Sequence, residues 1–285
     1  MLGALRTILL LASLCLTSCS TAKRAETEQI EQQAIQPRAD QVLFFERPLT
    51  LAAARKSDVP SPLVVLLDSD PWAAVIGSDS PTFALYEDGT VIQRTTTGFI
   101  TARLTDKEVR QLLDRLDLRA LSQSYGRFEA EVATDQPEQD LLAYWGEKPV
   151  FVSVYGSLKD DKVRSKMPQE VNAAYDVLSS FKHLESRAWL PASVEVMIWP
   201  YENAPEPSIS WPEDWPRLDD PQNVRRGGNS FSIFMPSQKL PELRAFLKRK
   251  SEKGAIEIDG QKWSAAIRFP FPHEKLWMAP HPELK

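Results

Sequence analysis

The stretch PTFALYEDGTVIQR, residues 81–94, carries the clearest fold signal in the chain. Two runs rich in β-branched and aromatic residues flank Asp88-Gly89. A two-residue turn of this kind needs positive φ, which glycine adopts freely and aspartate tolerates. The pattern therefore predicts a β-hairpin. The expected cross-strand pairs are Leu85 with Ile92 and Tyr86 with Val91.

An amphipathic helix is expected directly after this hairpin. Thr105 and Glu108 have the spacing of a capping box, in which the two side chains satisfy backbone N–H groups of the first helical turn. Apolar residues then recur every three or four positions, which places them on one helical face. They are Val109, Leu112, Leu113 and Leu116. A hairpin followed by a helix is thus the expected building unit.

This unit recurs in looser forms along the chain. Residues 141–156 read as two strands before a helix at 169–181, and a strand at 230–234 precedes a helix at 240–250 and a hairpin at 255–269. The sequence therefore predicts an α+β fold with mostly antiparallel sheets built from hairpin-helix units and about three main helices. In the last hairpin, the Asp259-Gly260 turn would pair Glu257 with Lys262 and Ile256 with Trp263.

The composition is that of an ordinary folded protein. Of 285 residues, 42% are hydrophobic and 26% charged, and the formal net charge of -5 argues against nucleic-acid binding. The longest basic cluster is Lys248-Arg249-Lys250. It fits the C-terminal end of a helix, where cations meet the negative end of the macrodipole, and the alternative is a contact with phosphate or anionic lipid.

The first residues have the pattern of an export signal. Arg6 precedes an uncharged apolar run from Thr7 to Ser18, which has the length of a secretory h-region and is too short to span a membrane. Both cysteines of the chain, Cys15 and Cys19, lie here. Cleavage before Cys19 would leave the mature chain without a free thiol, which excludes cysteine catalysis and thiolate metal sites.

The segment Leu16-Thr17-Ser18-Cys19 resembles the lipobox of bacterial lipoproteins: a branched apolar residue, two small residues and a cysteine. The resemblance implies that Cys19 is lipidated. Such a lipid would anchor the protein firmly, because each buried CH₂ of an acyl chain contributes roughly 0.8 kcal/mol to membrane binding. It also implies, with Ser20 after the cysteine, an outer-membrane position facing the periplasm. The alternative is an ordinary signal peptide with an incidental Cys19. The segment at 80–94 is also similar to parts of bacterial secreted and lipoprotein families, which implies no residue roles.

Four parts of the chain are expected. They are a lipoprotein signal peptide (1–18), a flexible polar tether (19–58), an α+β domain (59–186) and a C-terminal α+β domain or subdomain (187–285). The last part begins with a Trp/Pro-rich loop at residues 189–229, which is longer than a mere connection requires.

The Trp/Pro-rich loop supplies the candidate contact residues. Trp199, Tyr201, Trp211 and Trp215 would either stack on sugar rings or grip a partner, or fold back with the prolines to close one end of a sheet. Asp219, Asp220 and Glu213 are the acidic residues beside them. Arg225 and Arg226 before two glycines would form either an anion cradle or a solvated turn.

No cofactor or metal site is expected from the sequence. His183, His273 and His281 lie far from one another at no metal-binding spacing, and neither a phosphate-binding glycine loop nor a nucleophile elbow is present. For the three histidines a solvated or locally bonded side chain is the expectation. No catalytic residue is therefore assigned.

These observations predict a lipid-anchored cell-envelope protein that serves as a non-enzymatic binding or structural module. Its expected partners are the membrane, through the anchor, and another envelope protein or a glycan. One alternative is an envelope hydrolase acting on glycan or peptidoglycan through acidic residues near the Trp/Pro-rich loop. Another is a lipoprotein that inhibits or assists a second envelope protein.

Overall fold

The computed structural model describes residues 41–42, 59–72, 79–144, 149–226 and 230–277. The chain divides into two compact units, residues 1–41 and 42–285, and the fold below is that of the second. The expected signal peptide with Cys19, and the tether apart from residues 41–42, lie outside the described residues.

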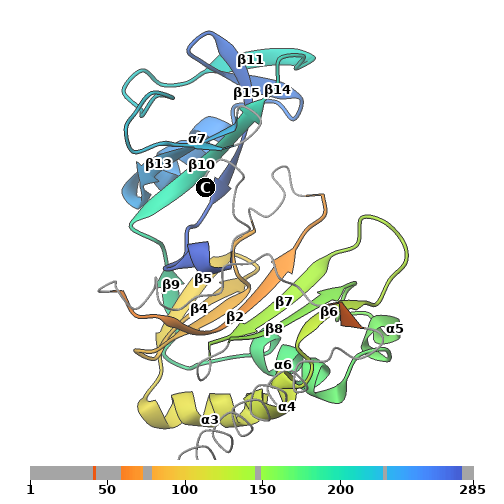
Figure 1. Cartoon of the computed structure of the whole chain (residues 1–285). Coiled ribbons are helices and arrows are strands. Elements are labelled where there is room, and N and C mark those ends of the chain that lie inside the picture. The colour runs from red at the N-terminus through yellow and green to blue at the C-terminus, as the bar shows by residue number, and fades with distance from the viewer. Residues whose placement is uncertain (1–40, 43–58, 73–78, 145–148, 227–229, 278–285) are drawn as a thin grey trace, which may run out of the picture. The chain divides into compact units, whose positions relative to one another are not determined.

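A nine-stranded sheet contains most strands from the first half of the chain (Figure 1). Its order is β1-β6-β8-β7-β2-β3-β4-β5-β9, and it is mixed because β6 runs parallel to β8. Its strands are β1 (Gln41–Val42), β2 (Pro62–Ser69), β3 (Phe83–Tyr86), β4 (Thr90–Thr95), β5 (Gly98–Arg103), β6 (Gly126–Glu129), β7 (Glu138–Ala143), β8 (Val150–Tyr155) and β9 (Arg187–Trp189).

A six-stranded sheet is formed by the later strands in the order β11-β14-β15-β10-β13-β12. It is also mixed, since β11 runs parallel to β14. The expected boundary at residue 187 falls at β9, which nevertheless pairs with β5 of the nine-stranded sheet. The strands are β10 (Ser193–Pro200), β11 (Glu206–Ser210), β12 (Val224–Arg226), β13 (Ser230–Pro236), β14 (Gly254–Ile258) and β15 (Gln261–Arg268).

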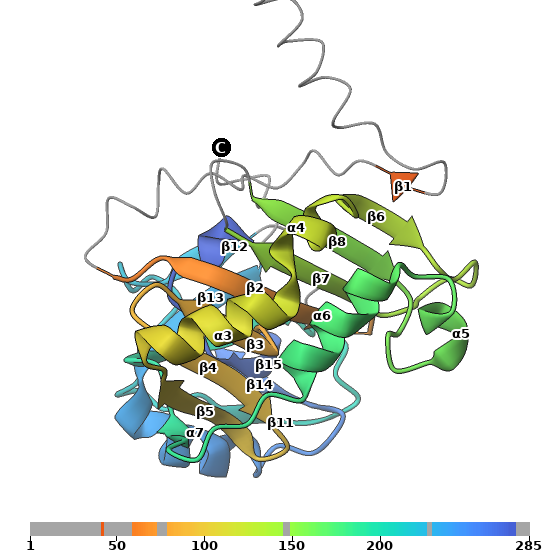
Figure 2. The same ribbon diagram turned by 90° about the horizontal axis from the view of Figure 1, so that it is seen from below.

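Helices cover one face of each sheet. In the nine-stranded sheet, α3, α4 and α6 lie across one face (Figure 2), where Leu112, Leu116 and Leu178 pack against Val64, Leu66 and Phe83. In the six-stranded sheet, Leu243 and Phe246 of α7 pack against the apolar side chains of β10. The helices are α3 (Asp106–Leu116), α4 (Leu118–Ser122), α5 (Asp161–Arg164), α6 (Gln169–Ser179) and α7 (Leu240–Leu247), with 3-10 turns η1 (Ser237–Lys239) and η2 (Glu274–Leu276).

The expectation of an α+β fold with mostly antiparallel sheets built from hairpin-helix units is wrong. The described chain is sheet-rich, with two mixed sheets that are larger than its helical part. The physical reason is that the parallel pairs β6–β8 and β11–β14 join strands that are distant in sequence, and no turn signal marks such pairings.

The first hairpin forms with a register one residue away from the expected one. Leu85 pairs with Val91, and three residues, 87–89, separate β3 from β4. Only Gly89 has positive φ, at 81°, and its N–H donates to the Tyr86 carbonyl at 2.9 Å. The side chain of Asp88 accepts from the N–H of Thr90 at 3.0 Å, which favours this longer loop over a two-residue turn.

Two local predictions are confirmed. Thr105 and Glu108 form both halves of the capping box at the start of α3. In the Asp259-Gly260 turn both residues have positive φ, 52° and 73°. The cross-strand pairs there are those expected, Glu257 with Lys262 and Ile256 with Trp263.

Residues 269–277 cover part of the second face of the nine-stranded sheet. This segment follows β15, and its Phe271, Leu276 and Trp277 are buried against Val65 and Leu142. The segment therefore ties the end of one sheet to the face of the other.

Candidate functional site

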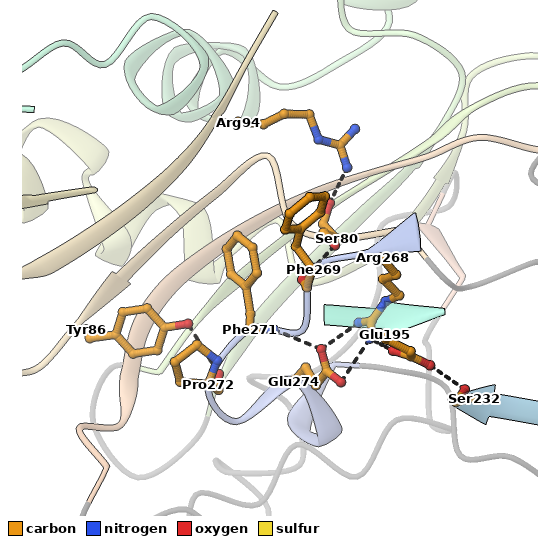
Figure 3. A network of polar contacts seen from close by, with 10 residues as sticks. All are labelled: Ser80, Tyr86, Arg94, Glu195, Ser232, Arg268, Phe269, Phe271, Pro272 and Glu274. Atoms are coloured by element: carbon orange, nitrogen blue, oxygen red, sulfur yellow. Dashed lines mark hydrogen bonds and ion pairs between the residues drawn. The ribbon is translucent and has the colours of Figure 1, made fainter. Parts of the chain in front are cut away.

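A buried ion-pair network anchors the 269–277 segment (Figure 3). The Glu195 carboxylate lies on β10 opposite Arg268 on β15, and Arg268 Nη1 donates to Glu195 Oε2 at 2.6 Å. Arg268 Nη2 donates to Glu274 Oε2 at 2.6 Å, while the hydroxyl of Ser232 donates to Glu195. Because both side chains of the central pair are at most 2% exposed, the network is internal to the fold.

The charge of Arg268 is held in place by its partners. Burial works against the charged guanidinium, but the hydrogen bonds and ion pairs with Glu274 and Glu195 outweigh it, and the pKa of Arg268 lies above its ordinary value. Glu274 also accepts from the N–H of Phe271 at 3.0 Å. The ion pairs therefore fix the turn that carries Phe271.

Two further hydrogen bonds tie this segment to residues of the nine-stranded half, and a third holds Ser80, which makes one of them (Figure 3). The Ser80 hydroxyl donates to the carbonyl of Phe269 at 2.9 Å, and the Arg94 guanidinium donates to the Ser80 carbonyl. The Tyr86 hydroxyl donates to the carbonyl of Pro272 at 3.2 Å. The position of Phe269 is thus set by residues of both sheets.

Aromatic rings from three distant segments meet beside this network. The ring of Phe99 on β5 lies edge-on to Trp189 on β9, with centroids 5.9 Å apart, and 5.4 Å from the ring of Phe269. Phe271 packs on both Phe99 and Trp189, and the Arg94 guanidinium lies 5.9 Å from the centre of the Phe99 ring. Such a cluster gives a rigid apolar surface, because aromatic side chains have few rotatable bonds.

A groove of about 730 Å³ runs between this cluster and α7. Its volume is in the range of small-molecule sites. We call it the aromatic groove. It is lined by Thr97, Gly98, Phe99, Ala188, Trp189, Leu190, Ser237, Gln238, Leu240, Pro241, Arg244, Ala245, Lys248 and Phe269.

The polar groups of the aromatic groove are few and uneven. The hydroxyl of Ser237 donates to the Pro191 carbonyl, so it is already engaged. The charged lining residues are Arg244 and Lys248, and no acidic residue lines the groove. Within the described residues neither cation has an ion-pair partner. Lys239, the residue directly before α7, is paired with Glu242 at 2.8 Å. The rim is therefore cationic.

Trp211 and Trp215 lie inside the six-stranded half of the fold. They are 4% and 7% exposed, and both rings contact Phe246 of α7, with centroids 5.5 and 5.3 Å away. Trp211 Nε1 donates to the carbonyl of Pro216 at 3.0 Å. Both side chains thus support α7 from within and offer no face to a ligand.

Trp199 and Tyr201 lie at the end of β10 and are half-buried. Alternation along the strand puts Trp199 on the face opposite α7, because Val196 and Ile198 face that helix. A cavity of about 520 Å³ nearby is lined by Pro200 and Glu202 but not by Trp199 or Tyr201. The four candidate aromatic residues are therefore not brought together in one site.

The acidic candidates Glu213, Asp219 and Asp220 share a surface cavity of about 460 Å³. Glu213 and Asp219 are exposed, and Asp220 accepts from the N–H of Gln222 at 2.9 Å, which is an ordinary turn contact. Arg217, which also lines this cavity, pairs with Asp259. These three side chains therefore do not form the buried acid–base pair that hydrolysis of a glycan would use.

The perturbed carboxyl group beside the ion-pair network is Asp79. Partial burial raises its pKa, and this outweighs the hydrogen bond that its carboxylate accepts from the N–H of Asp70 at 3.1 Å. Arg94 and Arg268 lower the pKa to a smaller extent. Asp79 lies outside the aromatic groove, so it supplies no acid there.

The histidines have separate local roles. His183 Nε2 lies 3.6 Å from a carboxylate oxygen of Glu108, and His273 Nε2 is 2.9 Å from the carbonyl of Val59. His281, Gly227, Gly228 and the side chains of Arg225 and Arg226 lie outside what the structure describes. Among the described residues, no group of three or more His, Cys, Asp or Glu side chains is arranged to hold a metal ion.

In the described part of the chain no helix combines the length and apolarity that crossing a membrane requires. No protein-family model, no curated protein and no solved structure matches the chain.

Sequence reasoning missed the aromatic groove. Phe99, Trp189 and Phe269 are each separated by at least eighty residues, so no local pattern joins them. The available signal was the unusual density of aromatic residues at 269–277, together with the i, i+4 spacing of Arg244 and Lys248.

Proposed function

We propose that the chain is a lipid-anchored protein of the cell envelope that acts as a non-enzymatic binding module. In this proposal Cys19 carries the lipid, the body faces the periplasm from the outer membrane, and the aromatic groove is the binding surface. The lipobox-like segment at residues 16–19 supports the anchor.

The observation that carries the binding role is the lining of the aromatic groove. Its walls are mostly aromatic and aliphatic, with Thr97 and Gln238 as further polar side chains, and the hydroxyl of Ser237 is engaged. Its two charged residues are exposed cations, Arg244 on α7 and Lys248 at the C-cap of this helix. General acid–base catalysis needs a titratable group positioned against the reacting atom, whereas binding needs apolar area and a few polar contacts. The groove meets the second requirement.

The anchor is tested by labelling cells with radioactive palmitate. The wild-type chain should incorporate label, and a Cys19→Ala variant should not. Cys15→Ala is the matched control, because it removes a cysteine from the segment that cleavage would discard. Label that persists in Cys19→Ala would overturn the anchor.

The alternative is an envelope hydrolase that uses Glu213, Asp219 and Asp220, which share one surface cavity. It is tested by incubating the purified full chain with muropeptides and envelope glycans. Turnover that disappears in Asp219→Asn or Asp220→Asn would replace the binding role. Turnover absent from the wild-type chain, together with retention of a ligand by the aromatic groove, supports the binding role.

A further inference from the structure

We propose that the aromatic groove binds a single-chain anionic amphiphile: an aliphatic tail lies against Trp189, Phe99 and Phe269, and a carboxylate head contacts Arg244 and Lys248. This inference rests on the proposed binding role and names its ligand class. It is carried by the apolar walls and the cationic rim, which line one groove.

The walls select a hydrocarbon. Phe99, Trp189 and Phe269 present carbon surfaces, and Leu190 beside them is 50% exposed. A polar group placed among these side chains would lose water without gaining a hydrogen bond, which is unfavourable. An aliphatic chain loses nothing in this way and gains from leaving water.

The same argument disfavours a peptide. Each residue of a peptide brings an N–H and a C=O that need partners. On the helix side of the groove, the backbone N–H of Ser237 already donates to the Ala192 carbonyl at 3.1 Å, and the hydroxyl of Ser237 donates to Pro191. A tail of CH₂ groups makes no such demand.

The rim selects a negative charge. Arg244 on α7 and Lys248, the C-cap residue that follows α7 with helical backbone angles, are four residues apart, about 6 Å along the helix axis, so one head group is within reach of both. Glu242 is the acidic residue of this helix, and it is paired with Lys239. The guanidinium of Arg244 matches a carboxylate in shape, because its two N–H groups point in parallel.

Trp211 and Trp215 explain why α7 holds this position. Their buried rings pack on Phe246, on the inner side of the helix. Arg249 also lies over the Phe246 ring, with its guanidinium carbon 5.1 Å from the ring centre. The helix is thus held through Phe246, and the two rim cations are presented from a rigid element.

Photocrosslinking tests the ligand class directly. The full chain in phosphatidylcholine nanodiscs is incubated with a diazirine derivative of dodecanoate, irradiated, and digested for mass spectrometry. Crosslinks should concentrate in residues 188–190 and 240–248, and unlabelled dodecanoate should compete. A diazirine derivative of dodecyltrimethylammonium, with the same tail and the opposite charge, should label these residues at least fivefold less.

Two variants test the walls and the rim. Ala245 is exposed and lines the groove, so Ala245→Trp should fill it and reduce crosslinking at least tenfold; Ala133→Trp, at an exposed loop position, is the control. The double variant Arg244→Gln with Lys248→Gln should raise the dodecanoate-probe concentration that gives half-maximal crosslinking about fivefold, as expected for two exposed ion pairs. The matched control is Lys107→Gln with Arg110→Gln on α3, which removes two exposed cations away from the groove and should leave the crosslinking unchanged.

Several outcomes would overturn the inference. They are crosslinks spread over the surface, equal labelling by the cationic probe, and labelling unchanged in Ala245→Trp. Competition by phosphatidylglycerol vesicles as strong as that by dodecanoate would assign the groove to a membrane surface, and stronger competition by an acidic apolar peptide would assign it to a protein. If Ala245→Trp does not fold by circular dichroism, Leu190→Ser provides the second wall variant.

Failure of this inference is distinguishable from failure of the proposed function. Palmitate incorporation at Cys19 reports the anchor alone, and turnover of glycans reports the hydrolase alternative alone. A chain that takes palmitate and turns over no glycan but gives no groove crosslink with dodecanoate keeps the anchor and loses this ligand class.

Discussion

Arg268 and Glu195 form an ion pair at 2.6 Å with both side chains buried, and they are direct cross-strand neighbours on β15 and β10. Glu195 has an exposed fraction of 0%. Removing only the cation would leave a carboxylate in the protein interior, with the hydroxyl of Ser232 still donating to it. The two partners differ in this respect, because Arg268 would keep a second carboxylate partner, Glu274, if Glu195 were removed.

We expect Arg268→Met to lower the free energy of unfolding by about 3–5 kcal/mol, because a lone buried charge is costly. The double variant Arg268→Met with Glu195→Gln should recover a substantial part of this loss, since it removes the stranded charge. Urea unfolding followed by circular dichroism measures both. A double variant no more stable than Arg268→Met would show that Glu195 is stabilised by other means.

Two glycines at the hairpin turns should respond differently to alanine. Both have positive φ, 81° at Gly89 and 73° at Gly260, and this conformation costs other residues about 1–2 kcal/mol. At Gly89 a Cβ would also overlap the carbonyl oxygen of Leu104, whereas at Gly260 no atom lies within 4 Å. Gly89→Ala should therefore lose at least ~1 kcal/mol more than Gly260→Ala in thermal or urea unfolding. Equal losses would contradict the close packing of Leu104 on this turn.

Trp215 and Trp199 test whether the Trp/Pro-rich loop serves packing or contact. Trp215 is 7% exposed and touches Phe246, so Trp215→Ala should cost about 3–5 kcal/mol of stability through the cavity it leaves. Trp199 is half-buried at the end of β10, and Trp199→Ala should cost a fraction of that. Urea unfolding of both variants is the measurement. A Trp215→Ala chain with wild-type stability would show that the ring is not part of the core.

The buried tyrosines predict a loss of stability at alkaline pH. Burial raises the pKa of Tyr175 to about 12, with the charge of Asp68 adding to it, and burial also raises the pKa of Tyr86 well above its ordinary value. The unfolded chain releases these protons near pH 10, so the stability they contribute is complete below pH 10 and falls as the pH rises towards 12. Tyr175→Phe should flatten this decline.

A phenolate absorbance titration provides the direct check. Of the six tyrosines, Tyr86 and Tyr175 should titrate late in the folded protein, and burial also raises the pKa of Tyr125. Unfolding in urea should move the absorbance change of these tyrosines back towards pH 10. Early titration of all six in the folded chain would contradict the burial of Tyr86 and Tyr175.

The parts of the fold that could be predicted are those decided within a few residues. The capping box at Thr105 and Glu108 and the turn at Asp259-Gly260 depend on side chains and φ preferences that neighbouring residues settle. The same Asp-Gly dipeptide at 88–89 gave a different loop, because the Asp88 side chain bonds to Thr90 and the returning chain at Leu104 donates to the Gly89 carbonyl. The second of these contacts is made by a residue fifteen positions away.

The rest of the fold depends on contacts between distant residues. The parallel pair β6–β8 and the placement of β9 beside β5 follow from packing of the whole sheet, which no turn sequence encodes. The candidate site shows the same limit. Trp211 and Trp215 stood out because they lie in a Pro-rich stretch, whereas Trp189 became a groove residue only through Phe99 and Phe269.

The location of residues 269–277 sets the order in which this protein can become stable during its synthesis. β2 and β3 emerge roughly two hundred residues before Phe271 and Trp277, which cover their second face. Until those late residues are made, Val65 and Leu142 have no cover from this segment, and until Arg268 is made Glu195 lacks that guanidinium. The growing chain therefore reaches its native state only after residues 269–277 have been made, which keeps it open to handling by chaperones until then.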